Sequence, residues 1–305
     1  MRIVVKVGTS TLAYGTGRLN IRHTEQLVKV LSDLKNEGHE VILVSSGAIG
    51  MGVGKLSLPQ RPKDTASKQA CAAVGQCELM YTYDRLFNAT ITPLRRSCSP
   101  AWTWSTPTGG STSRTLLSRL LELGAFAPSS NEKRHPLPPT RSRPIGDNDT
   151  LAAIVACCCK ADLLVLLSDI DGLYTANPHT HPDAALIPLV EEITPEVMAL
   201  ADGAGSALGT GGMATKLRAA RMVTGSGADM VIANGAHRRC CTTLPTASPP
   251  GPVSKDADRR IRHDDTGDSG SRPRGKNSRC TGKQRDPHPR SVGHVRLAVP
   301  PGKHG

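Results

Sequence analysis

The sequence has 305 residues, enough for one large α/β domain with an appendage or for two domains. Hydrophobic residues make up 38% of it and aromatic residues only 3%, which is low for a fully globular chain, so we expect part of it not to fold. No apolar run approaches membrane-spanning length and the N-terminus lacks a signal-peptide layout, which excludes an integral membrane protein and predicts a soluble, cytoplasmic one.

The net charge of +12 is confined to two blocks of the chain. Residues 1–87 and 146–237 together carry 15 basic and 18 acidic side chains, whereas residues 88–145 carry 8 and 2, and residues 238–305 carry 15 and 6. Both basic blocks lack helical or alternating apolar periodicity, apart from the ordered-looking stretch LLSRLLELGA at residues 116–125. We therefore interpret residues 1–237 as one domain with an anomalous segment at 88–145. Residues 238–305 are interpreted as a disordered basic tail, rich in Pro, Arg, Ser and Gly, because this composition buries too little apolar area to offset its ordering entropy.

The nine cysteines do not form a pattern typical of a metal site. No Cys-x-x-Cys pair occurs, and the consecutive Cys157, Cys158 and Cys159 would point about 100° apart on a helix. We predict reduced thiols and no metal site made by the protein alone.

Outside the two basic blocks, strand and helix patterns alternate. The first strand, residues 2–8, is a β-branched run that ends in glycine, and an amphipathic helix over 21–38 follows it. A second strand begins at Glu40 and breaks into a loop of small residues, SSGAIGMGVG. The later elements, in order, are helices over 64–87 and 151–159, strands over 162–169 and 186–190, two further helical stretches, and a strand over 229–234.

The strands are apolar throughout instead of alternating with polar residues, which is typical of a mostly parallel sheet covered on both faces. In such sheets ligands collect at the carboxyl ends of the strands. The loops there are KVGTS (6–10), SSGA (45–48) and SD (168–169). Each places glycine, hydroxyl groups or charge where a phosphate or an amino acid could be held.

Lys6 is unusual because it lies inside an apolar strand. Burying an ammonium group alone is costly, so this lysine must be paired or functional if the strand is central. The alternative is an edge strand in which Lys6 faces solvent.

The segment GTGGMATK, residues 209–216, is a glycine-rich turn ahead of a helical stretch. Such a turn can offer backbone N–H groups to an anion, above all a phosphate, although a simple helix cap is the alternative. It is not a Walker loop, because no Gly-Lys-Ser/Thr follows a first glycine at the required spacing.

The run Asp147-Asn148-Asp149 has two interpretations. It is either a helix N-cap and turn cluster, or a source of carboxylates for a metal ion or for orienting cationic side chains.

Six long motifs, in this order, resemble the glutamate 5-kinases of the amino acid kinase family: KVGTST, VSSGAIGMG, SKQACAAVGQ, GDNDTLAAIVA, LLSDIDGLYTANP and GTGGMATKLRAA. The resemblance covers about residues 1–87 and 146–237. It implies a three-layer α/β/α sandwich and transfer of the ATP γ-phosphate to the side-chain carboxylate of L-glutamate, the first step of proline biosynthesis. It also implies that Mg²⁺ accompanies the nucleotide and that proline inhibits, and we expect a homo-oligomer.

The resemblance also assigns roles to residues at matching positions. Lys6 and Lys216 would neutralise charge on the transferring phosphoryl group, and Asp149 would hold both lysines in position. Phosphoryl transfer depends mainly on in-line placement and electrostatic stabilisation, which two lysines and Mg²⁺ can provide. The implied glutamate-binding residues are Ser46, Gly47, Ala48 and Asn148. The implied nucleotide-binding residues are Lys6, Gly8, Ser168, Asp169, Thr210, Gly211, Gly212, Met213, Ala214, Thr215 and Lys216.

The sequence departs from the family pattern within and after the basic blocks. The family's Asn-Glu-Asn-Asp motif has Arg134 in place of its final aspartate, and this arginine would repel the substrate ammonium by about 1–4 kcal/mol, depending on exposure. The family strand and helix between Asn88 and Arg114, and the closing strand and helix after Ala236, are not recognisable.

Two alternatives of different classes stay open. The first is another amino acid kinase, acting on aspartate, acetylglutamate, carbamate or uridylate. The second is a catalytically impaired chain whose basic tail binds nucleic acid without sequence specificity. Because the tail has no aromatic residues and no recognisable binding fold, we do not expect nucleic acid as a partner.

Overall fold

A computed structural model describes most of the region outside the two basic blocks. The described residues are 1–14, 18–90, 115, 117–119, 121, 127–129, 147–176, 178, 180–201, 212–235 and 295–297. They all belong to one compact unit.

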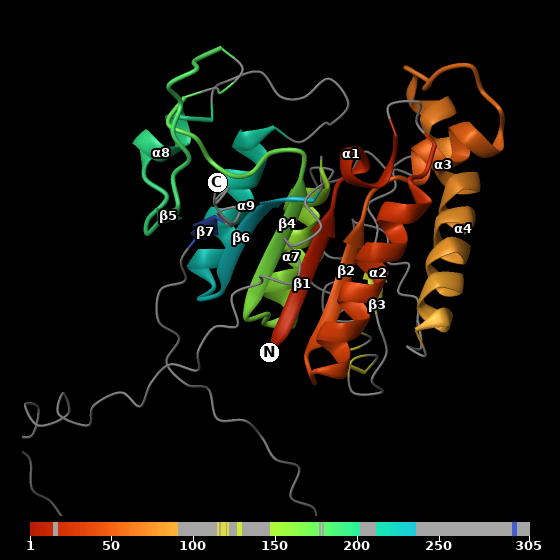
Figure 1. The fold of residues 1–305 in the computed structure, drawn as a ribbon, viewed down its shortest axis with the longest axis horizontal. Coiled ribbons are helices and arrows are strands. Elements are labelled where there is room, and N and C mark those ends of the chain that lie inside the picture. Colours follow the sequence, from red (N-terminus) through yellow and green to blue (C-terminus); the bar gives the residue numbers. More distant parts are fainter. Residues whose placement is uncertain are drawn as a thin grey trace, which may run out of the picture. The chain divides into compact units, whose positions relative to one another are not determined.

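Four parallel strands form the centre of the sheet (Figure 1). In spatial order they are β2 (Glu40–Ser45), β1 (Arg2–Val7), β4 (Leu163–Ser168) and β6 (Asp229–Asn234). Their register places Val4 of β1 between Ile42 of β2 and Leu164 of β4, and all three side chains are fully buried. The continuous apolar runs are therefore explained by burial on both faces, as the sequence predicted.

Short strands complete the sheet at both edges. These are β3 (Ala127–Ser129), parallel to β2; β7 (Val295–Leu297), parallel to β6; and β5 (Leu189–Val190), antiparallel to β7. Only the last two residues of the strand predicted over 186–190 form β5. The sequence did not predict β3 or β7, because three residues within an aperiodic block carry no strand pattern. The rest of the predicted tail lies outside the described residues.

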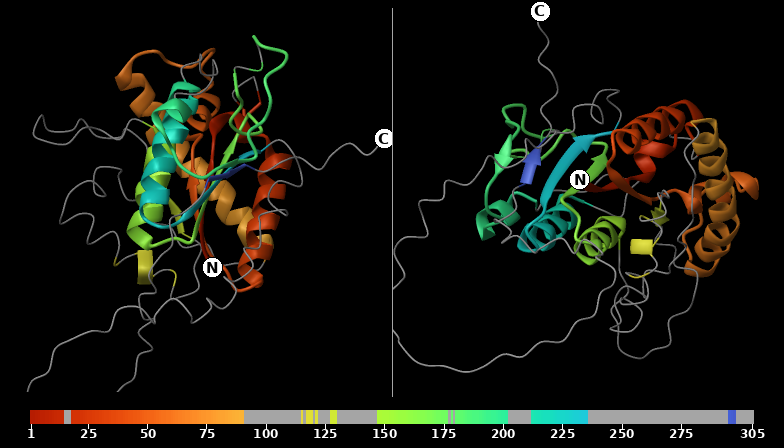
Figure 2. Two further views of the ribbon diagram at one scale, coloured as in Figure 1. Left: turned by 90° about the vertical axis from the view of Figure 1, so that its left-hand side faces the viewer. Right: turned by 90° about the horizontal axis from the view of Figure 1, so that it is seen from below.

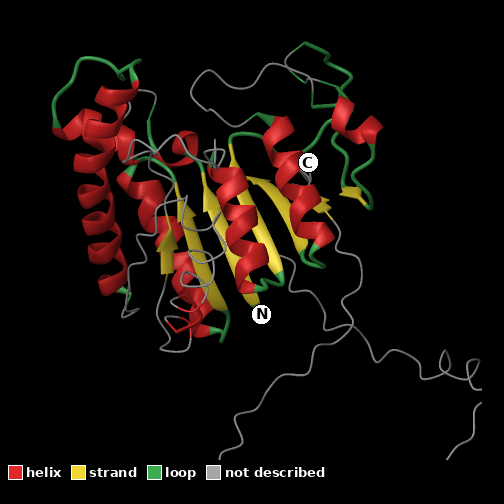
Figure 3. Cartoon of the chain, turned by 180° about the vertical axis from the view of Figure 1, so that it is seen from behind, coloured by secondary structure: helices red, strands yellow, loops and turns green. Residues whose placement is uncertain are grey.

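Two pairs of helices cover the opposite faces of the sheet (Figure 2). On one face lie α2 (Ile21–Asn36) and α4 (Thr65–Ala89), and on the other α7 (Asn148–Cys159) and α9 (Met213–Gly225). Alternate residues of β1 divide between two cores, since Ile3 and Val5 pack with α2 and α4 while Val4 packs with α7 and α9. Seen from behind, α7 and α9 lie in front of the strands and cover this face of the sheet (Figure 3). The three-layer α/β/α prediction is confirmed.

The segment after β2 differs from the sequence prediction. Residues predicted as a small-residue loop form the helix α3 (Ala48–Lys55). Glycines in both helices allow very close packing of α3 on α4. A Cβ atom on Gly52 of α3 would lie 1.9 Å from the carbonyl oxygen of Cys71, and one on Gly75 of α4 would lie 1.8 Å from that of Ala48. Glycine disfavours helices in isolation, so tertiary packing decides this one. Two shorter helices are α1 (Thr9–Leu12) and α8 (Pro195–Ala199).

Candidate active site

The carboxyl ends of the central strands meet at one edge of the sheet, the upper edge in Figure 1. Lys6 is the penultimate residue of β1, while Ser45, Ser168 and Asn234 are the last residues of β2, β4 and β6. All four strands are parallel, so these polar residues from distant parts of the chain lie along the same edge. This is where ligands bind in open parallel sheets.

A buried cluster of one carboxylate and two ammonium groups lies at this edge. Lys6 Nζ is 2.7 Å from Asp149 Oδ1, and Lys216 Nζ is 3.1 Å from Asp149 Oδ2. The side chains of Lys6, Asp149 and Lys216 are 9%, 1% and 4% exposed. The prediction that Lys6 is paired and not solvent-facing is confirmed, because β1 is a central strand. Three residues that the sequence singled out separately thus come together.

Helix starts position the members of this cluster. Asp147 caps α7 by accepting a hydrogen bond from the backbone N–H of Thr150 at 2.7 Å, which places Asp149 in the first turn. Gly212 is the N-cap of α9, and Thr215 and Lys216 occupy the first turn of that helix. The Thr215 hydroxyl lies 2.7 Å from the Gly212 carbonyl oxygen and 3.2 Å from Asp149 Oδ2. The cap interpretation of Asp147-Asn148-Asp149 and the cation-orienting one therefore both apply.

The pKa of Asp149 is set by two opposing causes. Burial of the carboxyl would raise its pKa, but the charges of Lys6 and Lys216 and their hydrogen bonds outweigh burial and hold the pKa below its usual value. Asp149 is therefore ionised at neutral pH. Together the three side chains carry a formal charge of +1, which suits the approach of an anion.

A neutral pair lies next to the charged cluster. Asn148, the neighbour of Asp149 in α7, donates from Nδ2 to the hydroxyl of Ser46 at 2.5 Å. Among the described residues, Asn148 Oδ1 is buried and accepts no hydrogen bond. Ser46 is itself nearly buried, and the following Gly47 has a φ of +109°, a conformation that glycine adopts readily. A buried acceptor without a donor is costly, so Asn148 Oδ1 suits a ligand that brings an N–H group.

The remaining predicted residues lie along the same edge where they are described. Gly8 donates its amide to the Leu167 carbonyl at 3.3 Å, and a Cβ atom on it would lie 3.5 Å from Lys6 Nζ. Ser168 donates to Asp169 Oδ1 at 3.1 Å. Ala48 begins α3, and Met213 and Ala214 begin α9. Thr210, Gly211 and Arg134 lie outside the described residues.

Sequence reasoning missed polar contacts within the loop after β4 and between this loop and the last residue of β6. Asn234 donates from Nδ2 to Asp171 Oδ1 at 3.0 Å, and the Tyr174 hydroxyl donates to Asp171 Oδ2 at 3.2 Å. Asn234 could have been found from the sequence, because it is the last residue of the predicted strand over 229–234 and ligands collect at the carboxyl ends of parallel strands.

Sequence reasoning also missed the contact between Ser45 and Tyr83. No sequence signal for it exists, because only the packing of α4 on β2 brings the two residues together.

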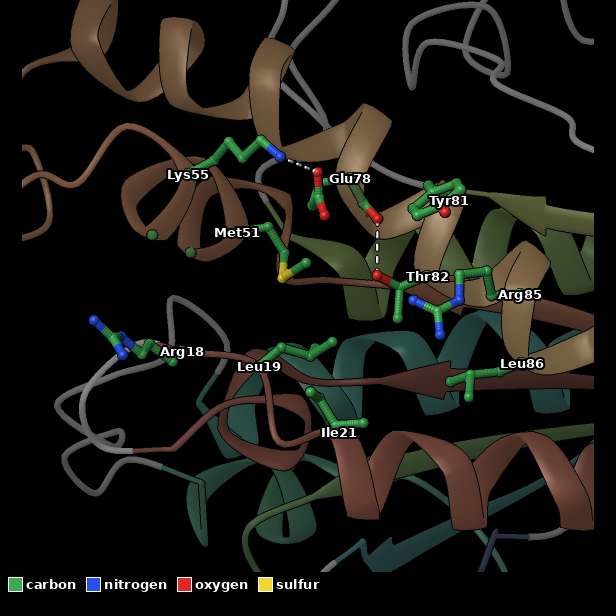
Figure 4. A pocket seen from close by; sticks show the side chains of 12 residues that line it. Arg18, Leu19, Ile21, Met51, Lys55, Glu78, Tyr81, Thr82, Arg85 and Leu86 are labelled. Atoms are coloured by element: carbon green, nitrogen blue, oxygen red, sulfur yellow. Dashed lines mark hydrogen bonds and ion pairs between the residues drawn. The ribbon is translucent and has the colours of Figure 1, made fainter.

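A separate cavity of about 540 Å³ lies between α3, α4 and the segment before α2 (Figure 4). Leu19, Met51 and Leu86 give it an apolar lining, and Lys55 and Glu78 form an ion pair of 2.9 Å at its rim. None of the predicted site residues lines it. The cavity is therefore distinct from the charged cluster.

Membrane-spanning helices and metal-binding clusters are both absent from the described part of the chain. Within it, no helix is long and apolar enough to span a membrane. Among the same residues, no group of three or more His, Cys, Asp or Glu side chains could hold a metal ion.

Comparisons with known proteins identify relatives of the chain. The model of the amino acid kinase family matches residues 1–234. The chain is 49% identical over 234 residues to the glutamate 5-kinase of Clostridium acetobutylicum, covering 77% of this chain and 86% of that protein. It is 43% identical over 267 residues to the glutamate 5-kinase of Listeria monocytogenes serotype 4a, covering 87% of this chain and 96% of that protein.

Two solved structures share the fold. Isopentenyl phosphate kinase of T. acidophilum superposes with a TM-score of 0.55 at 19% identity, covering 81% of this chain and 97% of that one. Carbamate kinase from Giardia lamblia gives a TM-score of 0.54 at 13% identity, covering 77% of this chain and 93% of that one. At these identities the likeness concerns the fold alone.

Proposed function

The chain belongs to the amino acid kinase family, and we propose that it transfers the γ-phosphate of ATP to the side-chain carboxylate of L-glutamate, giving L-glutamyl 5-phosphate, the first step of proline biosynthesis. The glutamate 5-kinases at 43% and 49% identity support this acceptor. The observation that carries the proposal is the Lys6–Asp149–Lys216 cluster directly beside the Ser46–Asn148 pair. One side of the site suits a phosphoryl group and the other suits an amino acid.

The charged cluster would act on the migrating phosphoryl group. Transfer spreads negative charge over the phosphoryl oxygens, and catalysis consists mainly of positioning and of stabilising that charge. Lys6 and Lys216 approach from two different elements and would contact these oxygens, while Asp149 fixes both ammonium groups. Fixed charges in a site protected from water stabilise the transition state without needing to reorganise.

The reaction needs no general base. The attacking group is a carboxylate with an ordinary pKa of about 4.3, so it is already ionised at neutral pH. Asp149 is held by two lysines and has a lowered pKa, which makes it a poor proton acceptor. Its role is therefore to position the lysines and not to move a proton.

The neutral pair would hold the amino-acid end of glutamate. Asn148 Oδ1 is a buried acceptor without a donor in the described chain, and the substrate ammonium would supply N–H groups to it. Ser46 and the backbone N–H groups at the start of α3, from Ala48 onward, would bind substrate oxygens. Because Asn148 and Asp149 are adjacent in α7, one helix start would align the acceptor with the phosphoryl group.

The nucleotide would lie along the loops after β4 and before α9. Met213 and Ala214 would supply backbone N–H groups at the start of α9, because the amides of Thr215 and Lys216 already donate to the Gly212 carbonyl. Ser168 and Asp169 lie at the end of β4. Mg²⁺ usually binds through one or two carboxylates plus substrate phosphates, so we expect the ion to arrive with ATP. Asp169 would be its protein contact, and the ion would neutralise phosphate charge.

The test is glutamate-dependent release of ADP by the full-length chain, with hydroxylamine trapping of the acyl phosphate product. We expect trapped γ-glutamyl hydroxamate that depends on ATP, Mg²⁺ and glutamate. Aspartate, acetylglutamate, carbamate and uridylate serve as competing acceptors, and faster turnover with any of them would overturn the proposal. Inhibition by proline and assembly into a homo-oligomer stay predictions, to be measured by adding proline to the same assay and by light scattering.

A further inference from the structure

A buried hydrogen bond connects α4 to the end of β2. The Tyr83 hydroxyl lies 2.8 Å from Ser45 Oγ, and both residues are fully buried. Burying a hydroxyl in an apolar layer is unfavourable unless it is hydrogen-bonded, and a phenylalanine would fill nearly the same volume. The hydroxyl is therefore not needed to fill the core, and its contribution is the hydrogen bond to Ser45 at the polar edge of the sheet.

The protons of the two hydroxyl groups can be assigned by their acceptors. Ser45 Oγ also lies 3.0 Å from the carbonyl oxygen of Ser46, which can only accept a hydrogen bond. Both protons are used if Tyr83 donates to Ser45 and Ser45 donates to the Ser46 carbonyl. Burial raises the pKa of Tyr83 far above its usual value, against a smaller opposite effect of the Ser45 hydrogen bond, so Tyr83 remains a donor at physiological pH.

This relay completes the fixation of Ser46. Its amide donates to the Val7 carbonyl at 3.1 Å, and its hydroxyl accepts from Asn148 at 2.5 Å. The Ser45 hydroxyl donates a hydrogen bond to the carbonyl oxygen of Ser46. The Ser46 end of the peptide between Ser46 and Gly47 is thus held by three hydrogen bonds, and Gly47 then turns with a φ of +109° into α3.

We propose that Tyr83 is a positioning residue for the acceptor substrate, acting through Ser45 on the Ser46–Gly47 peptide and on the first N–H groups of α3. The inference rests on the proposed function, because it assigns the same loop to glutamate binding. Tyr83 is well suited to this role, because α4 is locked against α3 by the close approach at Gly52 and Gly75. Its ring also packs against Phe87 at a centroid distance of 6.3 Å.

The test compares Tyr83→Phe with Tyr81→Phe in the full-length enzyme. Tyr81 is on the same helix but 57% exposed, so its variant controls for loss of a tyrosine hydroxyl. We expect Tyr83→Phe to raise the KM for glutamate about threefold to tenfold, the usual effect of losing one buried hydrogen bond, and to change the KM for ATP by less than about twofold. Tyr81→Phe should leave both constants unchanged. If Tyr83→Phe only destabilised the protein, the KM for glutamate and the KM for ATP would not change by different factors.

A double-mutant cycle tests the relay. Ser45→Ala should raise the KM for glutamate at least as much as Tyr83→Phe. The double variant should have the same KM for glutamate as Ser45→Ala alone or a lower one, because both substitutions interrupt the same chain of hydrogen bonds from Tyr83 through Ser45 to the Ser46 carbonyl. An unchanged KM for glutamate in an active Tyr83→Phe variant, or fully additive effects, would overturn the inference.

Amide hydrogen exchange separates this inference from the proposed function, because it needs no substrate. Tyr83→Phe should accelerate exchange in the peptide that contains residues 45–48, relative to wild type and to Tyr81→Phe. If the wild type does not phosphorylate glutamate, the proposed function fails, and unchanged exchange in this peptide would then overturn the positioning role as well.

Discussion

The two ends of the site are built by different means. At the phosphoryl end, charged side chains from β1, α7 and α9 meet within 2.7 and 3.1 Å. At the acceptor end, a hydroxyl, an amide and backbone groups around Ser46 form neutral hydrogen bonds. The second end is braced by glycine-mediated contact between α3 and α4.

This difference follows from how the two kinds of interaction depend on geometry. Coulomb energy falls only as the inverse of distance, so charged groups tolerate small displacements. A hydrogen bond weakens steeply with distance and angle, and its neutral partners need accurate placement. The acceptor end therefore requires a rigid support, while the phosphoryl end requires that its charges be present and buried. Four substitutions test this contrast.

The largest expected effect is loss of turnover in Lys216→Ala. Removing one fixed charge that stabilises the transition state should lower kcat by roughly 10²–10⁴-fold, with little change in the KM for glutamate. The coupled ADP-release assay measures both constants. Lys29→Ala is the control, because Lys29 pairs with Glu25 on the exposed surface of α2. Wild-type turnover in Lys216→Ala would refute the role of the cluster.

Asp149→Asn should lower stability as well as activity. It leaves two buried ammonium groups without their carboxylate, which should cost about 3–5 kcal/mol in the free energy of unfolding at pH 7. Urea unfolding measures this value.

The pH dependence of that loss has a definite sign. The folded-state pKa of Asp149 is lowered from 3.8, so its contribution is fully present above about pH 5 and is lost as the pH falls through the folded pKa. The stability difference between wild type and Asp149→Asn should therefore shrink below about pH 4. A difference that stayed constant down to low pH would contradict the ion-pair explanation.

Gly52→Ala should damage the support of the acceptor end. Its new Cβ would lie 1.9 Å from the Cys71 carbonyl oxygen, so the helices must separate, at a cost of about 1–3 kcal/mol or more. Gly54→Ala is the matched control in the same helix, because nothing lies within 4 Å of its Cβ position, and it should stabilise by about 0.5–1 kcal/mol. Thermal unfolding compares the two, and equal melting temperatures would show that α3 does not depend on this contact.

The smallest expected effect is that of Asn148→Ala. Loss of the buried acceptor and of the bond to Ser46 should raise the KM for glutamate by about tenfold, equivalent to about 1.4 kcal/mol, while the KM for ATP stays near its wild-type value. Steady-state kinetics with each substrate varied in turn measures the split. Equal effects on both KM values would indicate that the two ends are not separate.

The sequence by itself determined the parallel α/β architecture and most of the candidate site residues. Continuous apolar runs such as residues 163–167 require burial on both faces of a sheet, and polar residues at their carboxyl ends must then share one edge. A lysine inside such a run must find a partner, so Lys6 was identifiable without coordinates. Long motifs around Asp149 and Lys216 carried the family resemblance.

Only the tertiary structure decided which of these groups touch and what supports them. Asp149 joins Lys6 and Lys216 because α7 and α9 pack side by side on one face of the sheet, a relation that is absent from local sequence patterns. The glycine-rich α3 is a helix because Gly52 and Gly75 let it pack closely on α4, although its composition favours a loop. Contact between residues far apart in sequence depends on how whole elements pack, so the partnership of Tyr83 and Ser45 could not be derived from either segment alone.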